Sequence, residues 1–422
     1  MKRWLMGMIV GLWLLAAHPA AQDSVNEQAA LSAQLKTNSR PLSYSAGKLA
    51  GAGADWLRRE AQRARFCLIG EEHGFAENPL FAAALLAQLD GYQYFAAEIG
   101  TLTAARLEAA ARQQSARAVL AEFNHRYPFS LPFFNWQEEG ELLATALKLP
   151  GKAPRLWGLD QEFFFSPVYH FERLRQLAPN ARARALVQTY CDKTQGELAH
   201  ATATHNPGTA FLVTATAADF DQLDAAFGQR NDEAQRILRA LRESAEIYQK
   251  NARGEIYANN LQRSQLLKRN FMAFYNAALQ SGPPPKVFFK FGAGHVMRGR
   301  NYINVFDLGN FVAELAESQG ATSFHVLVVA AGGTYNKFFP FVGNEADKRK
   351  PFVPANVYGY ADLQAFVSLA ATPGWQVVDL RPLRARIGTR ALPVLPRGIL
   401  DILIGFDAVV LVDEAHPATF YE

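Results

Sequence analysis

The stretch that decides the fold is residues 66–98, which read FCLIGEEHGFAENPLFAAALLAQLDGYQYFAAE. Its first five residues, Phe66 to Gly70, are an apolar run that predicts a short buried strand. Asn78-Pro79 is typical of a helix start, an N-cap followed by a proline in the first turn, and Leu80 to Leu89 continue the helix. A glycine then precedes a second apolar strand, Tyr92 to Glu98. A β-α-β unit of this kind predicts parallel strands, because the crossover helix returns the chain to the same end of the sheet.

Other apolar runs predict further strands, most of them bounded by Gly, Pro or Asp. These strands are Arg155 to Leu159, Lys286 to Phe291, Phe324 to Ala330, Val377 to Leu380 and Ala408 to Val412. Residues from about 167 to about 280 carry almost no strand signal and predict a helical insert that ends in the helix Leu261 to Leu279. The expected fold class is therefore α/β, with a mostly parallel central sheet, flanking helices and a helical insert.

The N-terminus has the order of a secretory signal peptide. Lys2-Arg3 precede an apolar run from Trp4 to Ala17, and small residues lead to Ala21. We expect removal of residues 1–21, since an apolar run of about 14 residues is short for the roughly 20 that span a bilayer. The protein is then periplasmic or secreted, with no membrane attachment after signal removal. A retained anchor helix is the alternative.

Composition bounds the rest of the chain. With 422 residues, 49% of them apolar, it can bury a large core. We expect a polar linker over residues 22–49 and a single α/β domain over residues 50–422. Without Lys2 and Arg3 the net charge is about +2 and no long basic run occurs, so nucleic acid is not an expected partner. The two cysteines, Cys67 and Cys191, do not indicate a disulfide framework.

Polar residues follow four of the predicted strands directly. They are Glu71, Glu72 and His73, then Glu98, then Asp160 and Glu162, and finally the turn from Gly292 to His295. Ligands of open parallel sheets bind outside the carboxyl ends of the strands. The sequence therefore predicts one site for a small-molecule substrate at this edge, although an Asp at a strand end is also common in ordinary turns.

Two matching Gly-x-x-His turns, Gly70 to His73 and Gly292 to His295, stand out at this edge. A lone histidine in such a turn is more often structural, but a matching pair is more consistent with a shared water, substrate carbonyl or metal. Glu71, Glu77 and Glu98 are candidates to orient the pair or balance its charge. For Glu77 a helix-start carboxylate is an equally good interpretation.

Three other features are candidates for substrate contacts. An aromatic, proline-containing loop that includes Phe134 and Trp136 predicts an apolar pocket wall, with ordinary loop packing as the alternative. Asp160 is a candidate polar contact. Arg269, on the helix before the second histidine turn, is either a surface charge or a cation that stabilises an oxyanion. Gly-x-Ser-x-Gly, His-Glu-x-x-His and P-loop motifs are absent, which disfavours the common serine hydrolases, zincins and phosphate-loop enzymes.

Residues 70–77 resemble the signature of the erythromycin esterase family, with one residue fewer between Glu and His. The shorter spacing is similar to that of a wider superfamily that contains haem-binding ChaN-type lipoproteins and the TraB and TIKI proteins. Glu98 matches its second acidic residue, Arg269 its Arg…Met-Ala helix, and residues 292–296 its second histidine turn. Residues 406–410 resemble the closing strand of the esterases.

The resemblance implies an esterase-like hydrolase in which Glu71, His73, Glu98, Arg269 and His295 are catalytic. In this interpretation His73 activates water on an ester, Glu71 orients His73, and His295 and Arg269 stabilise the developing charge. The same resemblance implies a second possibility, a non-catalytic exported protein that binds haem or a divalent metal. Its ligands would be Glu71, His73, Glu98 and His295.

Overall fold

A computed structural model describes residues 30–204, 206–228, 232–337, 348–354, 363–371, 374–389, 392 and 395–421. The predicted signal peptide lies outside the described residues. Among the described residues, no helix is both long and apolar enough to cross a membrane.

One sheet organises the described part of the chain, with nine strands in the order β2-β1-β10-β11-β7-β3-β6-β4-β5. The six strands from β11 to β5 are parallel, and β2, β1 and β10 are joined to them antiparallel. The parallel strands are β3 (Phe66–Glu71), β4 (Tyr94–Gly100), β5 (Leu156–Asp160), β6 (Val287–Gly292), β7 (Ser323–Ala330) and β11 (Ala408–Val412). The expected α/β class with a mostly parallel sheet is confirmed.

The antiparallel flank corrects the expectation of a polar linker. β1 (Ser39–Ser45) pairs with β10 (Trp375–Asp379), and β2 (Lys48–Ala50) pairs with β1. Residues 30–37 are helical and bury Leu31 and Leu35. Short polar strands such as these carry little strand pattern of their own and are stabilised by pairing with a strand that is distant in the sequence.

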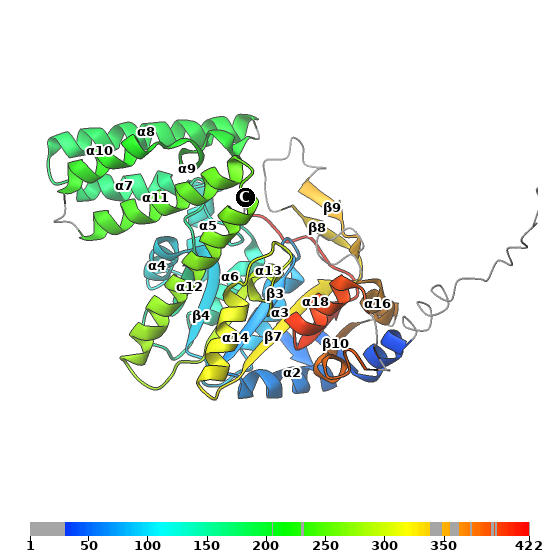
Figure 1. The fold of residues 1–422 in the computed structure, drawn as a ribbon. Coiled ribbons are helices and arrows are strands. Elements are labelled where there is room, and N and C mark those ends of the chain that lie inside the picture. The colour runs from blue at the N-terminus through cyan, green and yellow to red at the C-terminus, as the bar shows by residue number, and fades with distance from the viewer. Residues whose placement is uncertain are drawn as a thin grey trace, which may run out of the picture.

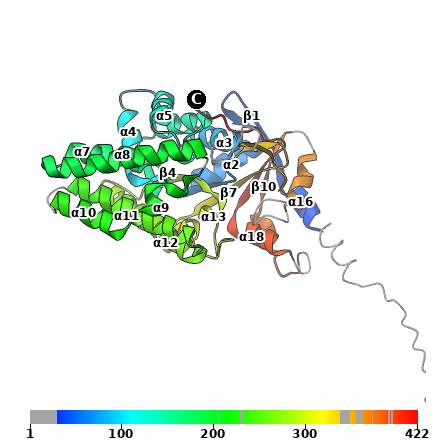
Figure 2. The same cartoon turned by 90° about the horizontal axis from the view of Figure 1, so that it is seen from above.

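Helices cover both faces of the sheet, as Figure 2 shows from above. Cys67 and Ile69 of β3 pack toward α2 (Ala52–Arg63), α3 (Glu77–Leu86), α4 (Thr101–Ala110), α5 (Ala116–Arg126) and α6 (Gln137–Ala146). Leu68 packs on the opposite face toward α12 (Ile256–Leu279), α14 (Leu308–Ser318) and α18 (Arg397–Gly405). Strands buried on both faces have near-continuous apolar sequences, which is why these runs could be predicted as strands.

The start of α3 differs from the expected N-cap. The helix begins at Glu77, and the Asn78 side chain donates to the Glu72 carbonyl instead of capping the helix. Pro79 still lies in the first turn, where a missing backbone N–H costs little. Gly91, with φ of 78°, precedes β4, as expected from a glycine after a helix.

The helical insert forms a bundle with its own apolar core beside the sheet (Figure 1). It contains α7 (Pro167–Leu177), α8 (Ala181–Thr204), α9 (Phe211–Thr214), α10 (Ala217–Phe227) and α11 (Asp232–Ala252). The predicted insert extended to about residue 280, but α12 packs on the sheet, through Leu267, Phe271 and Tyr275. Cys191 lies in the bundle and Cys67 in β3, and both are free, which settles a pairing that the sequence left open.

Several short elements complete the described chain. They are η1 (Pro207–Thr209), α13 (Ala293–Val296), β8 (Thr334–Asn336), β9 (Arg349–Pro351), α16 (Gln364–Val367), η4 (Ser368–Ala371) and α17 (Arg381–Arg384). β8 and β9 pair with each other antiparallel, away from the main sheet.

Candidate active site

Four neighbouring strands end at the candidate site. In the order β3-β6-β4-β5 their carboxyl ends carry Glu71 and His73, then His295, then Glu98, then Asp160. The expectation that these strand ends meet at one edge is confirmed. A cavity of about 380 Å³ lies there, with His73, Glu98, Asp160 and His295 in its lining.

His73 forms the first histidine–carboxylate pair. Its Nδ1 lies 3.0 Å from Oε1 of the buried Glu71. Burial opposes ionisation of Glu71, but Lys290 and His73 outweigh it, so the pKa of Glu71 lies below its ordinary value. An ionised Glu71 accepts a hydrogen bond from Nδ1–H, which makes Nε2 the basic nitrogen of the ring. Phe133 stacks on the imidazole with 4.0 Å between ring centroids and fixes its plane.

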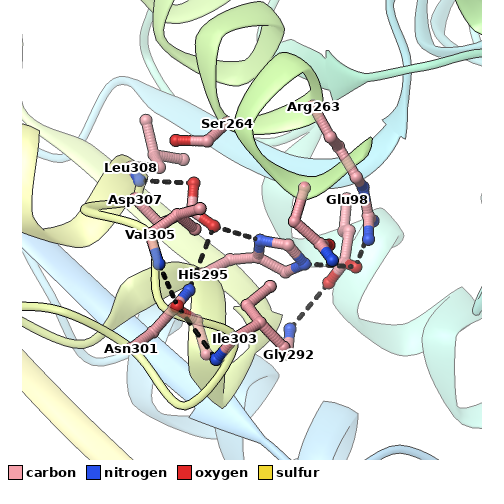
Figure 3. Close-up of polar contacts among 12 residues, drawn as sticks. Glu98, Arg263, Ser264, Gly292, His295, Asn301, Ile303, Val305, Asp307 and Leu308 are labelled. Carbon is pink, nitrogen blue, oxygen red and sulfur yellow. Dashed lines mark hydrogen bonds and ion pairs between the residues drawn. The ribbon is translucent and has the colours of Figure 1, made fainter. Parts of the chain in front are cut away.

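His295 forms the second pair, with a carboxylate that sequence reasoning missed (Figure 3). Its Nδ1 lies 2.8 Å from Asp307 Oδ2, and Asp307 also accepts the Leu308 backbone N–H at the start of α14. Burial and Arg263 lower the pKa of His295, but Asp307 and Glu98 more than compensate, so it lies above its ordinary value. His295 is therefore held as a cation at a higher pH than a solvated histidine.

Glu98 lies between the two histidines. It accepts the Gly292 backbone N–H at 2.7 Å and an Arg263 N–H at 2.7 Å, and its Oε1 lies 3.5 Å from His295 Nε2. A Cβ added at Gly292 would lie 2.9 Å from His73 Nε2 and 3.5 Å from Glu98 Oε2, so both side chains approach this glycine. Burial opposes ionisation, but His295, Arg263 and His73 lower the pKa of Glu98 to about 2.

The arginine of the site is Arg263, which was not predicted. Its guanidinium donates to Glu98 and to both oxygens of Asp160. The predicted Arg269 lies six residues later on α12, where its side chain is 55% exposed and pairs with Glu243. Six residues turn a helix by well over one and a half turns, so the two side chains leave α12 on different faces.

The predicted metal ligands do not converge on one point. Glu71 is bonded to His73 Nδ1 and Lys290 Nζ, and Glu98 is bonded to Gly292 and Arg263. Among the described residues, no group of three or more His, Cys, Asp and Glu side chains is arranged to hold a metal ion. The donor set therefore does not fit a metal centre in this arrangement.

The predicted substrate-binding residues are divided between cavity and core. Asp160 lines the cavity, whereas Phe134 and Trp136 are buried outside its lining. The neighbouring Phe133 lines it instead. Glu77 is hydrogen-bonded to the backbone N–H and Nδ1 of His416, so it binds the C-terminal segment and does not line the cavity.

Aromatic side chains from distant elements form much of the cavity wall. They are Phe133, Phe163, Phe164, Tyr248 and Tyr302. Tyr248 belongs to α11 of the helical insert, so the insert contributes directly to the site. Sequence position gave no signal for this, because α11 follows β5 by about seventy residues.

Three residues of the site were missed by sequence reasoning, for different reasons. Arg263 and Asp307 resemble an ordinary helical charge and an ordinary N-cap, and no local pattern distinguishes them. Lys290 did carry a signal, since it is a charge in the middle of an apolar strand and is 5% exposed. A buried lysine needs partners, and its Nζ has Glu71 and Glu139.

A comparison with protein-family models found no match, and a comparison with curated proteins found none. Solved structures do match. A mutant of the erythromycin esterase EreC in its open conformation aligns with 91% of this chain and 99% of its own, with a TM-score of 0.57 and 14% identity.

Two other structures match over a similar length. A succinoglycan biosynthesis protein covers 94% of this chain and 99% of its own, with a TM-score of 0.59 and 13% identity. A Bacillus cereus protein covers the same shares, with a TM-score of 0.56 and 15% identity. The fold of this chain is therefore one that the erythromycin esterase EreC also has, as the resemblance of the two Gly-x-x-His turns implied.

Proposed function

We propose that this protein hydrolyses an ester or a similar bond of a small molecule, with a water molecule activated by His73. The observation that carries the proposal is the presence of two histidine–carboxylate pairs at one cavity, Glu71–His73 and Asp307–His295. The pairs differ electrostatically, because His295 also has Glu98 beside its second nitrogen. One histidine is suited to accept a proton and the other to stabilise negative charge.

The reaction follows from these roles. As the water oxygen attacks the carbonyl carbon, Nε2 of His73 accepts the water proton and Glu71 stabilises the resulting imidazolium. The oxygen of the tetrahedral intermediate becomes negative, and the cationic His295 stabilises it. When the bond to the leaving group breaks, that group takes the proton from His73 and the acid product is released.

Arg263 has a supporting role in this scheme. Two carboxylates already bind its guanidinium, so it fixes Glu98 and Asp160 at the cavity.

The size of the expected effects follows from the roles of the two histidines. General base catalysis, the role of His73, contributes about 10²–10⁴-fold to rates. A positioned charge-stabilising group contributes about 10²–10³-fold. Loss of either histidine is therefore expected to be easily measurable.

The test is hydrolysis of a panel of chromogenic esters by the wild type, His73→Ala and His295→Ala. His200→Ala, which removes an exposed histidine of α8, is the matched control. Erythromycin is tested separately, with its hydrolysis followed by mass spectrometry, since EreC shares the fold. We expect loss of at least 100-fold in kcat/KM for the two site variants and none for the control. Equal rates for all four proteins, or no hydrolysis by any, would contradict the proposal.

We propose hydrolysis in preference to the alternative, non-catalytic binding of haem or a divalent metal. The carboxylates that would serve as ligands are bonded to Lys290, Arg263 and the histidines. Elemental analysis and a visible spectrum with added haem test this preference. One equivalent of bound metal, or a shifted haem absorption band that His73→Ala abolishes, would support the alternative instead.

We also propose export to the periplasm or beyond. The support is the sequence of residues 2–21, a charged, apolar and small-residue order. Cell fractionation and N-terminal sequencing of the mature protein are the test. A cytoplasmic protein that retains Met1 would contradict the proposal.

A further inference from the structure

Lys290 links the candidate base to a second buried carboxylate. It points to the face of the sheet that α6 covers, because it follows Phe288 by two residues along β6. Its Nζ donates to Glu71 Oε1 at 2.8 Å and to Glu139 Oε1 at 2.6 Å. The side chains of Glu71, Glu139 and Lys290 are 2%, 0% and 4% exposed.

Stability alone is a poor explanation of this arrangement. Removing charges from water is costly, and replacing a buried ion pair with apolar residues of similar volume is often neutral or stabilising. Phe288, two residues earlier on the same face of β6, shows that this face accepts apolar side chains. The contact of Lys290 with Glu71, beside His73, points instead to a role in the candidate active site.

We propose that Lys290 is a positioning residue of the Glu71–His73 base: it holds Glu71 in place against His73, and Glu139 anchors Lys290. This inference rests on the proposed function, in which His73 accepts a proton from water. It adds Lys290 and Glu139 to a site otherwise described by histidines, acids and an arginine.

The physical reason lies in the tautomer of His73. An ionised Glu71 accepts a hydrogen bond from Nδ1–H, so the unprotonated ring nitrogen is Nε2. Burial alone would favour the protonated form of Glu71, and the Coulombic attraction of Lys290 is the largest single effect that opposes it and lowers the pKa of Glu71. A protonated Glu71 would donate to Nδ1, the ring proton would move to Nε2, and His73 could no longer accept a proton there.

Glu139 has a different part in the arrangement. Among the described residues, Lys290 is the one side chain bonded to its carboxylate, and Glu139 Oε2 and Glu71 Oε2 are buried without a hydrogen-bond partner. Burial raises the pKa of Glu139 to about 7, although Lys290 opposes the rise. The hydrogen-bonded connection from Glu139 to the Glu71–His73 pair therefore runs through Lys290.

The experiment compares the wild type with Lys290→Met, Glu139→Gln and the double variant. We expect Lys290→Met to lower kcat about 10–100-fold, the range found for residues that orient a catalytic group, with KM changed less than about 2-fold. Glutamine keeps an acceptor for Lys290 but not the negative charge, so Glu139→Gln is expected to lower kcat, by less than Lys290→Met does. The double variant should match Lys290→Met in kcat, because coupled residues are not additive.

The double variant also covers a failure to fold. Lys290→Met alone leaves Glu139 buried without its cation, whereas the double variant removes both charges and should melt at a higher temperature than Lys290→Met.

Two variants are matched controls. Lys286→Met removes a lysine just before β6, and Glu141→Gln removes an acid from the exposed side of α6; both should retain wild-type kcat.

A spectroscopic readout separates this inference from the proposed function. Long-range ¹H–¹⁵N correlation of histidine-labelled protein, with His73→Ala for assignment, reports which nitrogen of His73 is protonated. We expect Nδ1–H in the wild type and Glu139→Gln, and Nε2–H in Lys290→Met and the double variant. An unchanged tautomer and an unchanged kcat in Lys290→Met would each overturn the inference. The tautomer shift would support it even if the panel of esters showed no hydrolysis.

Discussion

Arg263 places its guanidinium 2.7 Å from Oε1 of Glu98, although the two residues are 165 positions apart in the chain. Arg263 projects from α12 and Glu98 from the end of β4, and each is mostly buried. The same guanidinium binds Asp160 of β5. A single cation therefore joins the ends of two strands beneath the cavity.

Replacement of this cation should be far more damaging than replacement of its neighbour on the helix. Arg263→Gln leaves the buried Glu98 and Asp160 without their partner, which is expected to cost about 3–5 kcal/mol of unfolding free energy. Arg269→Gln breaks an exposed pair with Glu243 and should cost less than about 1 kcal/mol. Urea unfolding of both variants measures the difference.

The same pair of variants should differ in activity. We expect kcat/KM to fall in Arg263→Gln and to stay at the wild-type value in Arg269→Gln. If Arg263→Gln does not fold, Arg263→Lys retains the charge and provides the comparison. Similar losses of kcat/KM in the two glutamine variants would contradict the assignment of Arg263, and not Arg269, to the site.

A side chain at Gly292 should disturb His73. The Cβ of Gly292→Ala would lie 2.9 Å from His73 Nε2, closer than ordinary contacts allow, so the imidazole must move. A displacement of about 1 Å in a catalytic group can cost about 100-fold in rate, and we expect a loss of this size in kcat. Steady-state kinetics and circular dichroism separate lost activity from lost fold.

Gly196→Ala is the control for this substitution. Gly196 lies within α8, and nothing lies within 4 Å of a Cβ added there. Alanine favours a helix over glycine by about 1 kcal/mol, so this variant should be as active as the wild type and no less stable. Full activity of Gly292→Ala would contradict the described approach of His73.

Asp307→Asn should shift the alkaline limb of the pH profile. Asp307 raises the pKa of His295, and the cationic form of His295 is the proposed stabiliser of negative charge. Without that carboxylate the cation is lost at a lower pH, so kcat/KM should begin to fall at a lower pH than in the wild type. Asparagine is also a good N-cap, so the start of α14 is preserved.

The stability of the wild type should follow the same sign. A pKa of His295 above its unfolded value gives stability that is present below the unfolded pKa and is lost as pH rises through the folded pKa.

Profiles of kcat/KM between pH 5 and 10 for the wild type and Asp307→Asn test the predicted shift in activity. Asp221→Asn, an exposed substitution in α10, is the control. An alkaline limb that Asp307→Asn leaves in place would count against His295 as the charged group.

Glu98 should contribute stability that disappears in acid. Its pKa is lowered to about 2 from 4.5, so the contribution is present above about pH 4.5 and is lost as pH falls toward 2. Glu98→Gln removes a contribution on the order of 3 kcal/mol at neutral pH. The gap in unfolding free energy between wild type and variant should narrow from pH 7 to pH 3. A gap that stays constant in urea titrations at both pH values would refute the assignment.

Local pattern was sufficient to predict most of the fold. The parallel strands are apolar on both faces, so their runs were visible, and Ala408–Val412 has the predicted bounds. Strands β1 and β2 were not predicted, because these short polar strands gain their structure from pairing, β1 with β10 and β2 with β1. α12 begins at Ile256, five residues before the predicted start at Leu261.

The sequence by itself determined that Glu71, His73, Glu98, Asp160 and His295 share one edge of the sheet. The reason is that these residues follow parallel strands directly, and strand direction fixes the end at which they emerge. Only the tertiary structure decided which partners they have. Arg263 and Asp307 reach the site from α12 and the start of α14, and which of several similar charges does so depends on helix rotation and packing, which no local pattern records. Lys290 lies on β6 itself, and only packing shows that its partners are Glu71 and Glu139.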